Sequence, residues 1–187
     1  MSVKTQHDTE YSFWFITFTC MEWKPLFEAT QSYHLAYKWF QYLRDKQLAE
    51  VISYVVMPNH LHAILNLSQQ TTAINTLVGN GKRFMAYEIV KKLKEKGDLQ
   101  LLAELESAVS EREKKKGQKH KVFKDSFDCK AIFTEKFMLQ KMSYIHHNPV
   151  SGKWRLVDDY TDYEHSSASF YELGIVKHFE PKHFRDA

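Results

Sequence analysis

The order of the segments predicts an α+β fold in which an antiparallel sheet carries helices packed on one face. Segments rich in aromatic and β-branched residues alternate with segments whose apolar residues recur at helical spacing, in the order β-α-β-β-α-β-α. The chain has 187 residues, 43% of them hydrophobic, with only 6 Gly and 4 Pro. This composition is typical of one globular domain. We therefore expect residues 1–187 to form a single domain.

Each element is predicted from its local pattern. Aromatic, Thr and Ile residues indicate the first strand, and Pro58 and Asn59 supply the turn between the second and third strands. Pro149 disfavours helical geometry in the residue before it, so the last helix should end there. The strands are expected at residues 11–20, 50–57 and 60–67 and within 121–134, and the helices at 30–46, 72–93 and 135–148.

Two further segments stand apart from this core pattern. Residues 98–118 are dense in Glu and Lys and helical in pattern, which indicates a charged helical insertion. The residues after about 150 read as a less ordered C-terminal tail. Both are expected to belong to the same domain.

Composition excludes several classes of protein. No stretch approaches the ~20 apolar residues of a membrane span, and the N-terminus lacks the apolar run of a signal peptide. Two cysteines, Cys20 and Cys129, cannot build a disulfide framework and are expected to be reduced thiols. We therefore expect a cytoplasmic protein with no membrane partner.

The net charge of +3 is too small to indicate a nucleic-acid partner by itself. Basic residues nevertheless cluster in two places, at Lys91, Lys92, Lys94 and Lys96, and again from Lys114 to Lys124. Such clusters are usually solvated helix faces, and phosphate contact is the alternative. The candidates for DNA contact are Lys82, Arg83, Lys91, Lys92 and Lys94.

The sequence PNHLH at residues 58–62 carries the first chemical motif. Side chains alternate between the faces of a strand, so His60 and His62 point the same way. Two such imidazoles can converge on one divalent cation. A bare His-x-His is more often a pair of strand histidines, and a metal site built on one needs a third ligand from elsewhere.

The sequence SYIHHNP at residues 143–149 can supply that ligand. Tyr144 and Asn148 are four residues apart and therefore neighbours on one helix face, away from the apolar stripe of Met138, Met142 and Ile145. A phenol is a weak nucleophile at neutral pH unless a metal polarises the phosphate that it attacks. His147, on the flank of Tyr144, could contact DNA or metal or be a solvated side chain.

The chain resembles the single-tyrosine HUH transposases, and within them the REP-associated tyrosine transposase-like branch. The resemblance rests on VVMPNHLHAIL at residues 55–65, YIHHNPV at 144–150 and YEHSSASFY at 163–171. It implies the ferredoxin-like antiparallel sheet of the HUH endonuclease architecture. Where that family has a Trp-Gln-x-Gly-type segment before the last helix, this chain has VFKDSFDCKAIFT.

The resemblance also implies a chemistry for each motif residue. His60, His62 and Asn148 would bind Mg²⁺ or Mn²⁺, and Tyr144 would cleave single-stranded DNA through a 5′-phosphotyrosine bond, releasing a 3′-OH. The substrate would be a single-stranded hairpin from a repeated palindromic element. A homodimer is possible, because related insertion-sequence transposases exchange the tyrosine helix between subunits.

Two other functions remain open at this point. A non-catalytic module could bind single strands through aromatic residues of the first strand, although their alternation is more typical of a core face. A phosphodiester hydrolase could activate water at the histidines, with Tyr144 as a bystander. A covalent protein–DNA adduct on Tyr144, rather than on Tyr160, Tyr163 or Tyr171, separates these readings. The stacking candidates are Tyr11, Phe13, Phe15 and Phe18.

Overall fold

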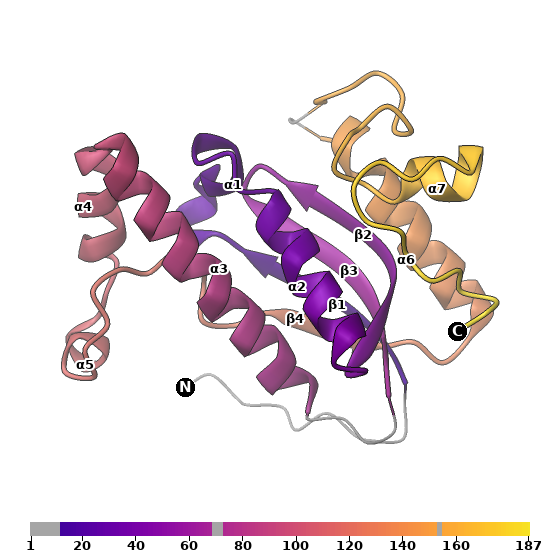
Figure 1. The fold of residues 1–187 in the computed structure, drawn as a ribbon, viewed down its shortest axis with the longest axis horizontal. Helices are drawn as coiled ribbons and strands as arrows, with labels where there is room; N and C mark the ends of the chain where they lie inside the picture. Colours follow the sequence, from indigo (N-terminus) through magenta and orange to yellow (C-terminus); the bar gives the residue numbers. More distant parts are fainter. Residues whose placement is uncertain (1–11, 69–72, 153–154) are drawn as a thin grey trace.

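The computed structural model describes residues 12–68, 73–152 and 155–187. Residues 11 and 72, where a strand and a helix were expected to begin, lie outside these ranges. Four strands form one antiparallel sheet in the order β2-β3-β1-β4 (Figure 1), which confirms the predicted α+β class. The strands are β1 (Phe13–Thr19), β2 (Ala49–Met57), β3 (His60–Leu67) and β4 (Asp128–Ala131).

The β2–β3 hairpin places the histidine motif in the middle of the sheet. Pro58 and Asn59 form its turn, and Met57 pairs with His60. On its other side β3 pairs with β1, so that Thr17 lies opposite His62. Because β3 has a neighbour on each side, the backbone that carries both histidines is held by hydrogen bonds along its length.

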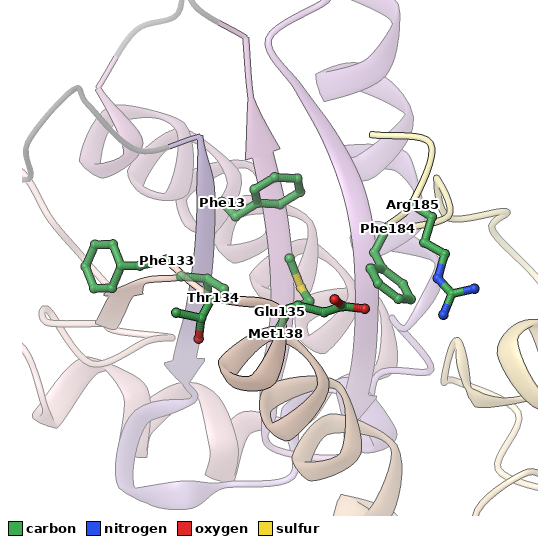
Figure 2. A pocket seen from close by; sticks show the side chains of 8 residues that line it. Phe13, Phe133, Thr134, Glu135, Met138, Phe184 and Arg185 are labelled. Carbon is green, nitrogen blue, oxygen red and sulfur yellow. The ribbon is translucent and has the colours of Figure 1, made fainter.

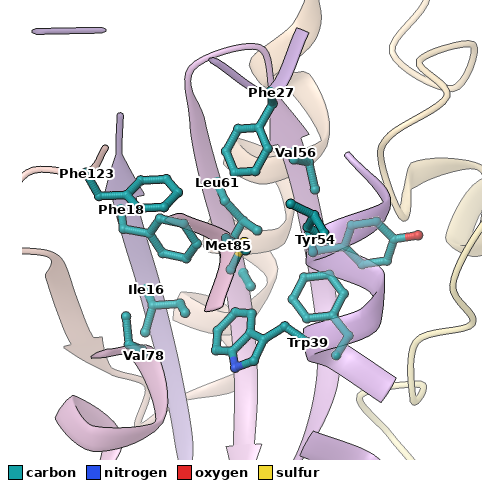
Figure 3. Packing of buried hydrophobic residues seen from close by; sticks show 14 of the residues in the cluster. Ile16, Phe18, Phe27, Trp39, Tyr54, Val56, Leu61, Val78, Met85 and Phe123 are labelled. Atoms are coloured by element: carbon teal, nitrogen blue, oxygen red, sulfur yellow. The ribbon is translucent and has the colours of Figure 1, made fainter. Parts of the chain in front are cut away.

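One face of the sheet carries α2 (His34–Asp45) and α3 (Ile74–Lys96), shown crossing the sheet in Figure 1. Their apolar side chains pack with those of β1 and β3 into the larger core, seen in Figure 3, where Ile16, Leu61, Trp39 and Met85 lie together. The two helices approach closely at Gly81, because a Cβ there would lie 2.5 Å from the Trp39 ring.

The opposite face carries α6 (Glu135–His147), so the expectation that helices pack on one face only is wrong. Met142 and Ile145 of α6 pack with Ile52 and Ile64 of the sheet in a second core cluster. The reason is visible in β2, whose sequence VISYVVM is apolar at successive positions rather than at alternate ones. Strands buried on both faces have this near-continuous apolar pattern.

The charged insertion consists of two helices, α4 (Leu99–Ser107) and α5 (Glu111–Lys114), at one end of α3 (Figure 1). Leu105 is fully buried and joins α4 to the larger core. Lys24 donates a hydrogen bond to Glu104, which ties α4 to the segment after β1. That segment holds a 3₁₀ turn, η1 (Met21–Trp23), and the short helix α1 (Leu26–Ala29).

The tail is packed against the sheet edge, so the expectation of a less ordered segment is wrong for residues 163–171. The backbone N–H of Val56 donates to His165 O at 2.8 Å, and that of Ser167 donates to Tyr54 O at 3.0 Å. The tail thereby pairs with the outer edge of β2, which would otherwise leave backbone groups unpaired. The 3₁₀ turn η2 (Asn148–Val150) leads from α6 into the tail, which contains α7 (Ala168–Leu173).

Two expectations from composition concern the cysteines and a membrane span. Cys20 and Cys129 are both free cysteines. Among the helices that the structure describes, none combines the length and the apolar character needed to cross a membrane.

Candidate active site

A cavity of about 760 Å³ opens beside the ends of β1 and β3, next to the C-terminal end of α6. We call it the histidine cavity. Its walls combine the residues of both sequence motifs with aromatic, hydroxyl and charged side chains from four other segments. The lining residues are Phe15, Thr17, Thr19, Trp23, His60, His62, Lys124, Ser126, Phe127, Asp128, Lys130, Lys141, Tyr144, Asn148, Ser151 and Gly152.

The side-chain amide of Asn148 lies between the two histidines. Its Oδ1 is 3.2 Å from Nε2 of His60, and its Nδ2 is 3.4 Å from Nε2 of His62. The histidines come from the central strand and Asn148 from the end of α6, so tertiary packing brings the two motifs to one point. Three nitrogen or oxygen donors thus share a space small enough for a single cation.

The Nδ1 atom of each imidazole already has a hydrogen-bond partner. Asn59 donates through Nδ2 to Trp23 O at 3.1 Å, which leaves its Oδ1 to accept from Nδ1 of His60 at 2.6 Å. Nδ1 of His62 is 2.6 Å from the Thr17 hydroxyl. With Nδ1 of His60 as the donor, its Nε2 keeps a lone pair directed at Asn148. Metal-binding histidines are oriented by partners of this kind.

Burial keeps both imidazoles uncharged at neutral pH. It lowers the pKa of His60 to about 4. The pKa of His62 lies well below its ordinary value, mainly through burial and then through its neighbours His60 and Lys141. A neutral imidazole has a lone pair to donate, whereas an imidazolium does not.

Tyr144 lies in the same cavity, one helical turn before Asn148. Its ring is half exposed and stands edge-on to His62, with 5.1 Å between ring centres. Phe15 supports the ring from the sheet at 6.0 Å. The amine of Lys141 lies 5.6 Å from the centre of the Tyr144 ring and 4.6 Å from that of Phe15. A tyrosine hydroxyl, an amine and three nitrogen or oxygen donors therefore share one cavity.

The other candidate tyrosines are occupied elsewhere. The hydroxyl of Tyr163 donates to Val56 O at 2.9 Å, and that of Tyr171 donates to Ile52 O at 2.8 Å. Tyr160 packs on the ring of His147, with 4.1 Å between ring centres. All three belong to the tail, and none of them lines the histidine cavity.

A buried hydrogen-bond cluster holds α6 in place behind the site. Nε2 of His146 lies 3.1 Å from the Ser53 hydroxyl and 3.0 Å from that of Ser167. Ser167 also accepts from the backbone N–H of Tyr54 at 2.9 Å. One serine of the YEHSSASFY motif thus ties the tail, β2 and α6 together. It supports the helix that carries Tyr144 and Asn148.

Several cavity residues were not singled out from the sequence. Lys141 had a detectable signal, because it lies three residues before Tyr144 and hence on the same side of the helix. Lys124 ends the second basic run of the sequence, whereas Trp23 and Lys130 had no signal. Only the tertiary fold brings these three residues to the histidines.

The structure does not bring the expected DNA-contacting lysines of α3 to this cavity. Lys82 donates to the carbonyls of Lys124 and Asp125, at 2.6 and 3.1 Å, and burial lowers its pKa to about 8. Lys92 donates to the carbonyls of Thr30 and Gln31. The remaining candidates of that helix, which covers the opposite face of the sheet, are Arg83, Lys91 and Lys94.

His147 does not line the histidine cavity, and the aromatic residues of β1 that the structure describes are buried or partly buried. The Nδ1 atom of His147 donates to Ser143 O at 2.9 Å, on the tail side of α6. Phe15 and Phe18 are 4% and 1% exposed and point to opposite faces of the sheet. Phe13 is partly buried, and Tyr11 lies outside the described residues.

A second cavity, of about 520 Å³, lies at the other end of α6. Figure 2 shows the side chains of Phe13, Phe133, Phe184 and Arg185 around it, together with Glu135 at the start of the helix. It shares no lining residue with the histidine cavity. None of the described residues that line it is a histidine or a tyrosine, so they offer no equivalent of the chemistry described above.

Comparison with known proteins gives a likeness in structure but none in sequence family. No protein-family model matches the chain, and no curated protein matches it. A solved structure, the REP-associated tyrosine transposase bound to a REP hairpin, superposes with a TM-score of 0.65 over 97% of this chain and 92% of that one, at 18% identity. The chain has the fold of a REP-associated tyrosine transposase.

This HUH transposase fold implies a divalent metal in general terms. The described residues contain no group of three or more His, Cys, Asp or Glu side chains that could hold a metal ion. The donors present are two imidazole nitrogens and one amide oxygen, a set that suits Mn²⁺, and Mg²⁺ through retained waters. Because three neutral donors leave coordination positions open, the residues fit the metal that the fold implies.

Proposed function

We propose that this chain is a metal-dependent single-stranded DNA transposase or endonuclease that cleaves and rejoins DNA through a 5′-phosphotyrosine on Tyr144. The observation that carries the proposal is the position of the Asn148 amide, within 3.4 Å of Nε2 of both His60 and His62. Tyr144 faces the same cavity from the preceding helical turn.

His60, His62 and Asn148 would hold Mg²⁺ or Mn²⁺. When bound, such a cation polarises the scissile phosphate as a Lewis acid. All three residues are uncharged, so none of them repels the phosphate. Lys141 places a positive charge beside the Tyr144 ring, where negative charge develops during attack. Because α6 carries Tyr144 and Asn148 together, the nucleophile keeps a fixed position relative to the donor atoms.

In the cleavage step the Tyr144 oxygen forms a bond to the phosphorus atom. The bond between phosphorus and the 3′ oxygen breaks, and its electron pair takes a proton to give a 3′-OH. The phenolic proton passes to water, to which half of this side chain is exposed. Rejoining is the reverse: a 3′-OH attacks the phosphotyrosine and releases Tyr144. Because each step exchanges one phosphate ester for another, no ATP is needed.

The substrate that we propose is a single-stranded DNA hairpin. The solved transposase of the same fold is bound to a REP hairpin. All four residues of the proposed site come from one chain, since α6 packs on its own sheet. We therefore propose that one chain suffices for cleavage, even if two chains associate.

The test is a covalent adduct on a single-stranded hairpin oligonucleotide with Mn²⁺, detected on a denaturing gel. We expect the wild type and Tyr160→Phe to form the adduct and Tyr144→Phe to form none. The free energy of unfolding of Tyr144→Phe should differ from that of the wild type by less than ~1 kcal/mol. His60→Ala combined with His62→Ala should also abolish the adduct while leaving salt-dependent DNA binding largely intact.

The same gel separates the other candidate functions. DNA cleaved without an adduct, by wild type and Tyr144→Phe alike, would show a hydrolase that activates water. Binding without cleavage or adduct would show a non-catalytic module. An adduct formed by folded Tyr144→Phe would move the nucleophile into the tail.

A further inference from the structure

Trp23 stands at the mouth of the histidine cavity with its indole exposed. The side chain is 53% accessible, whereas Trp14 and Trp39 are almost fully buried in the core. Its ring lies edge-on to His60, with 5.8 Å between ring centres. Exposure of a single tryptophan is not informative by itself, but this indole also forms part of the cavity wall beside a proposed metal ligand.

The backbone under this indole is held in an unfavourable conformation. Glu22 and Trp23 have φ angles of 51° and 60°, in the left-handed region that bulky side chains rarely adopt. Such conformations persist only where the surroundings impose them, and they cluster at ligand-binding sites. Here the turn is held by backbone hydrogen bonds from Met21 to Val122 O and from Trp23 to Cys20 O, and by Asn59, a side chain 1% exposed that donates to Trp23 O at 3.1 Å.

Asn59 also links this indole to the proposed metal site. Its Oδ1 accepts from Nδ1 of His60, while its Nδ2 holds the Trp23 carbonyl. One buried amide therefore orients a proposed metal ligand and fixes the strained turn that presents the indole. The distance between Trp23 and His60 is set by this shared anchor rather than by flexible loop contacts.

The ammonium group of Lys124 lies beside the exposed Trp23 ring. Nζ of Lys124 lies 4.7 Å from the centre of the Trp23 ring, and both side chains line the cavity. The backbone of Lys124 is in turn held by the ammonium of Lys82. Proteins that bind single strands without sequence preference combine an aromatic ring for base stacking with a cation for the backbone. Trp23 and Lys124 have this composition.

We infer that Trp23 and Lys124 form a stacking platform for one base of single-stranded DNA next to the phosphate that Tyr144 attacks. Four rings succeed one another along the cavity, Tyr144, His62, His60 and Trp23, with each neighbouring pair of centres within 6 Å. A strand whose phosphate lies at the histidines therefore presents an adjacent base to Trp23. This inference rests on the proposed function and specifies its substrate contact.

The test measures binding in a Tyr144→Phe background, without metal, so that no chemistry is needed. The probes are a single-stranded oligo(dT) of twelve nucleotides and an equally long strand of abasic sites. We expect Trp23→Ala to weaken oligo(dT) binding by about 5- to 150-fold, the range that stacking of one base supports. Binding of the abasic strand, which has nothing to stack, should not change.

Three further variants test whether the loss of affinity comes from misfolding, from loss of the aromatic ring, or from any exposed ring on the surface. Trp23→Gly removes the ring and relieves the left-handed backbone, so it should lose the same affinity without loss of thermal stability. Trp23→Phe keeps an aromatic face and should retain most of the affinity, while losing the quenching of tryptophan fluorescence that oligo(dT) produces in the parent. Tyr87→Ala removes a 71% exposed ring from α3 and should leave the affinity for both probes unchanged.

Equal binding of oligo(dT) by Trp23→Ala and its parent would overturn the inference, as would equal losses on both probes. A selective loss on oligo(dT) supports the platform even if the wild type forms no covalent adduct, in which case only the proposed catalysis fails. An adduct together with no selective loss would leave the catalysis standing and remove the platform.

Discussion

Oδ1 of Asn148 lies 3.2 Å from Nε2 of His60, although 88 residues separate them along the chain. The contact joins the start of a central strand to the end of a helix on one face of the sheet. Both groups are anchored independently, His60 through Asn59 and α6 through the His146 cluster. Donor atoms held in this way need little rearrangement to receive a cation.

The first expectation concerns the anchor of His60. Asn59→Ala removes the acceptor that fixes the Nδ1 proton, so we expect Mn²⁺ affinity to fall by about 10- to 100-fold, as for other partners of metal-binding histidines. Isothermal titration with Mn²⁺ measures this directly. Asn80→Ala, which removes an amide from the surface of α3, is the matched control. Equal affinities for the two variants would exclude an orienting role for Asn59.

The second concerns which lysines contact DNA phosphates. Lys130 and Lys141 line the histidine cavity, whereas Lys91 and Lys92 lie on α3 across the sheet. Replacing the first pair by Gln should make the slope of log affinity against log salt shallower, by roughly 0.7 per lost contact on a single strand. The second pair should leave the slope unchanged. The reverse result would place the DNA along α3.

The third concerns the serine that ties the tail to α6. Ser167→Ala leaves the buried N–H of Tyr54 without its acceptor and removes one partner of His146. We expect the free energy of unfolding to fall by about 1–3 kcal/mol, the cost of an unsatisfied buried polar group. Denaturant titration measures this loss. Ser107→Ala, on the exposed face of α4, should change stability by less than ~0.5 kcal/mol, and an equal effect would contradict the role of the cluster.

The fourth concerns pH. Burial lowers the pKa of His165 from 6.5 to about 4. Its ring stacks on Tyr33, with 3.7 Å between ring centres, and its Nδ1 lies 2.8 Å from the Tyr37 hydroxyl. Between these two pH values the unfolded chain binds more protons than the folded one, so stability is complete above pH 6.5 and is lost as the pH falls toward 4.

The effect should stay below the ~3 kcal/mol that such a pKa difference gives for a completely buried group, because His165 is partly exposed. Melting curves of the wild type and His165→Phe from pH 7.5 to 4.5 provide the measurement. We expect the stability advantage of the wild type to shrink as the pH falls. A constant difference across this range would show that His165 is not the titrating group.

The sequence by itself determined the local geometry of the site. Alternation along β3 put His60 and His62 on one face, and helical spacing put Tyr144 beside Asn148. The bounds expected for β3, residues 60–67, are those of the structure. These relations depend only on the repeat of a strand or a helix, which is a property of neighbouring residues.

Tertiary structure decided which faces meet. The alternation of β3 does not tell which helix covers the histidine face. α6 lies on the side opposite α2 and α3, where β2 also offers an apolar face. The tail pairs with the open edge of β2 and also bonds to α2 and α6. Trp23 and Lys124 lie a hundred residues apart and meet beside His60 through contacts with Asn59 and Lys82. Such contacts depend on long-range packing, which no local repeat encodes.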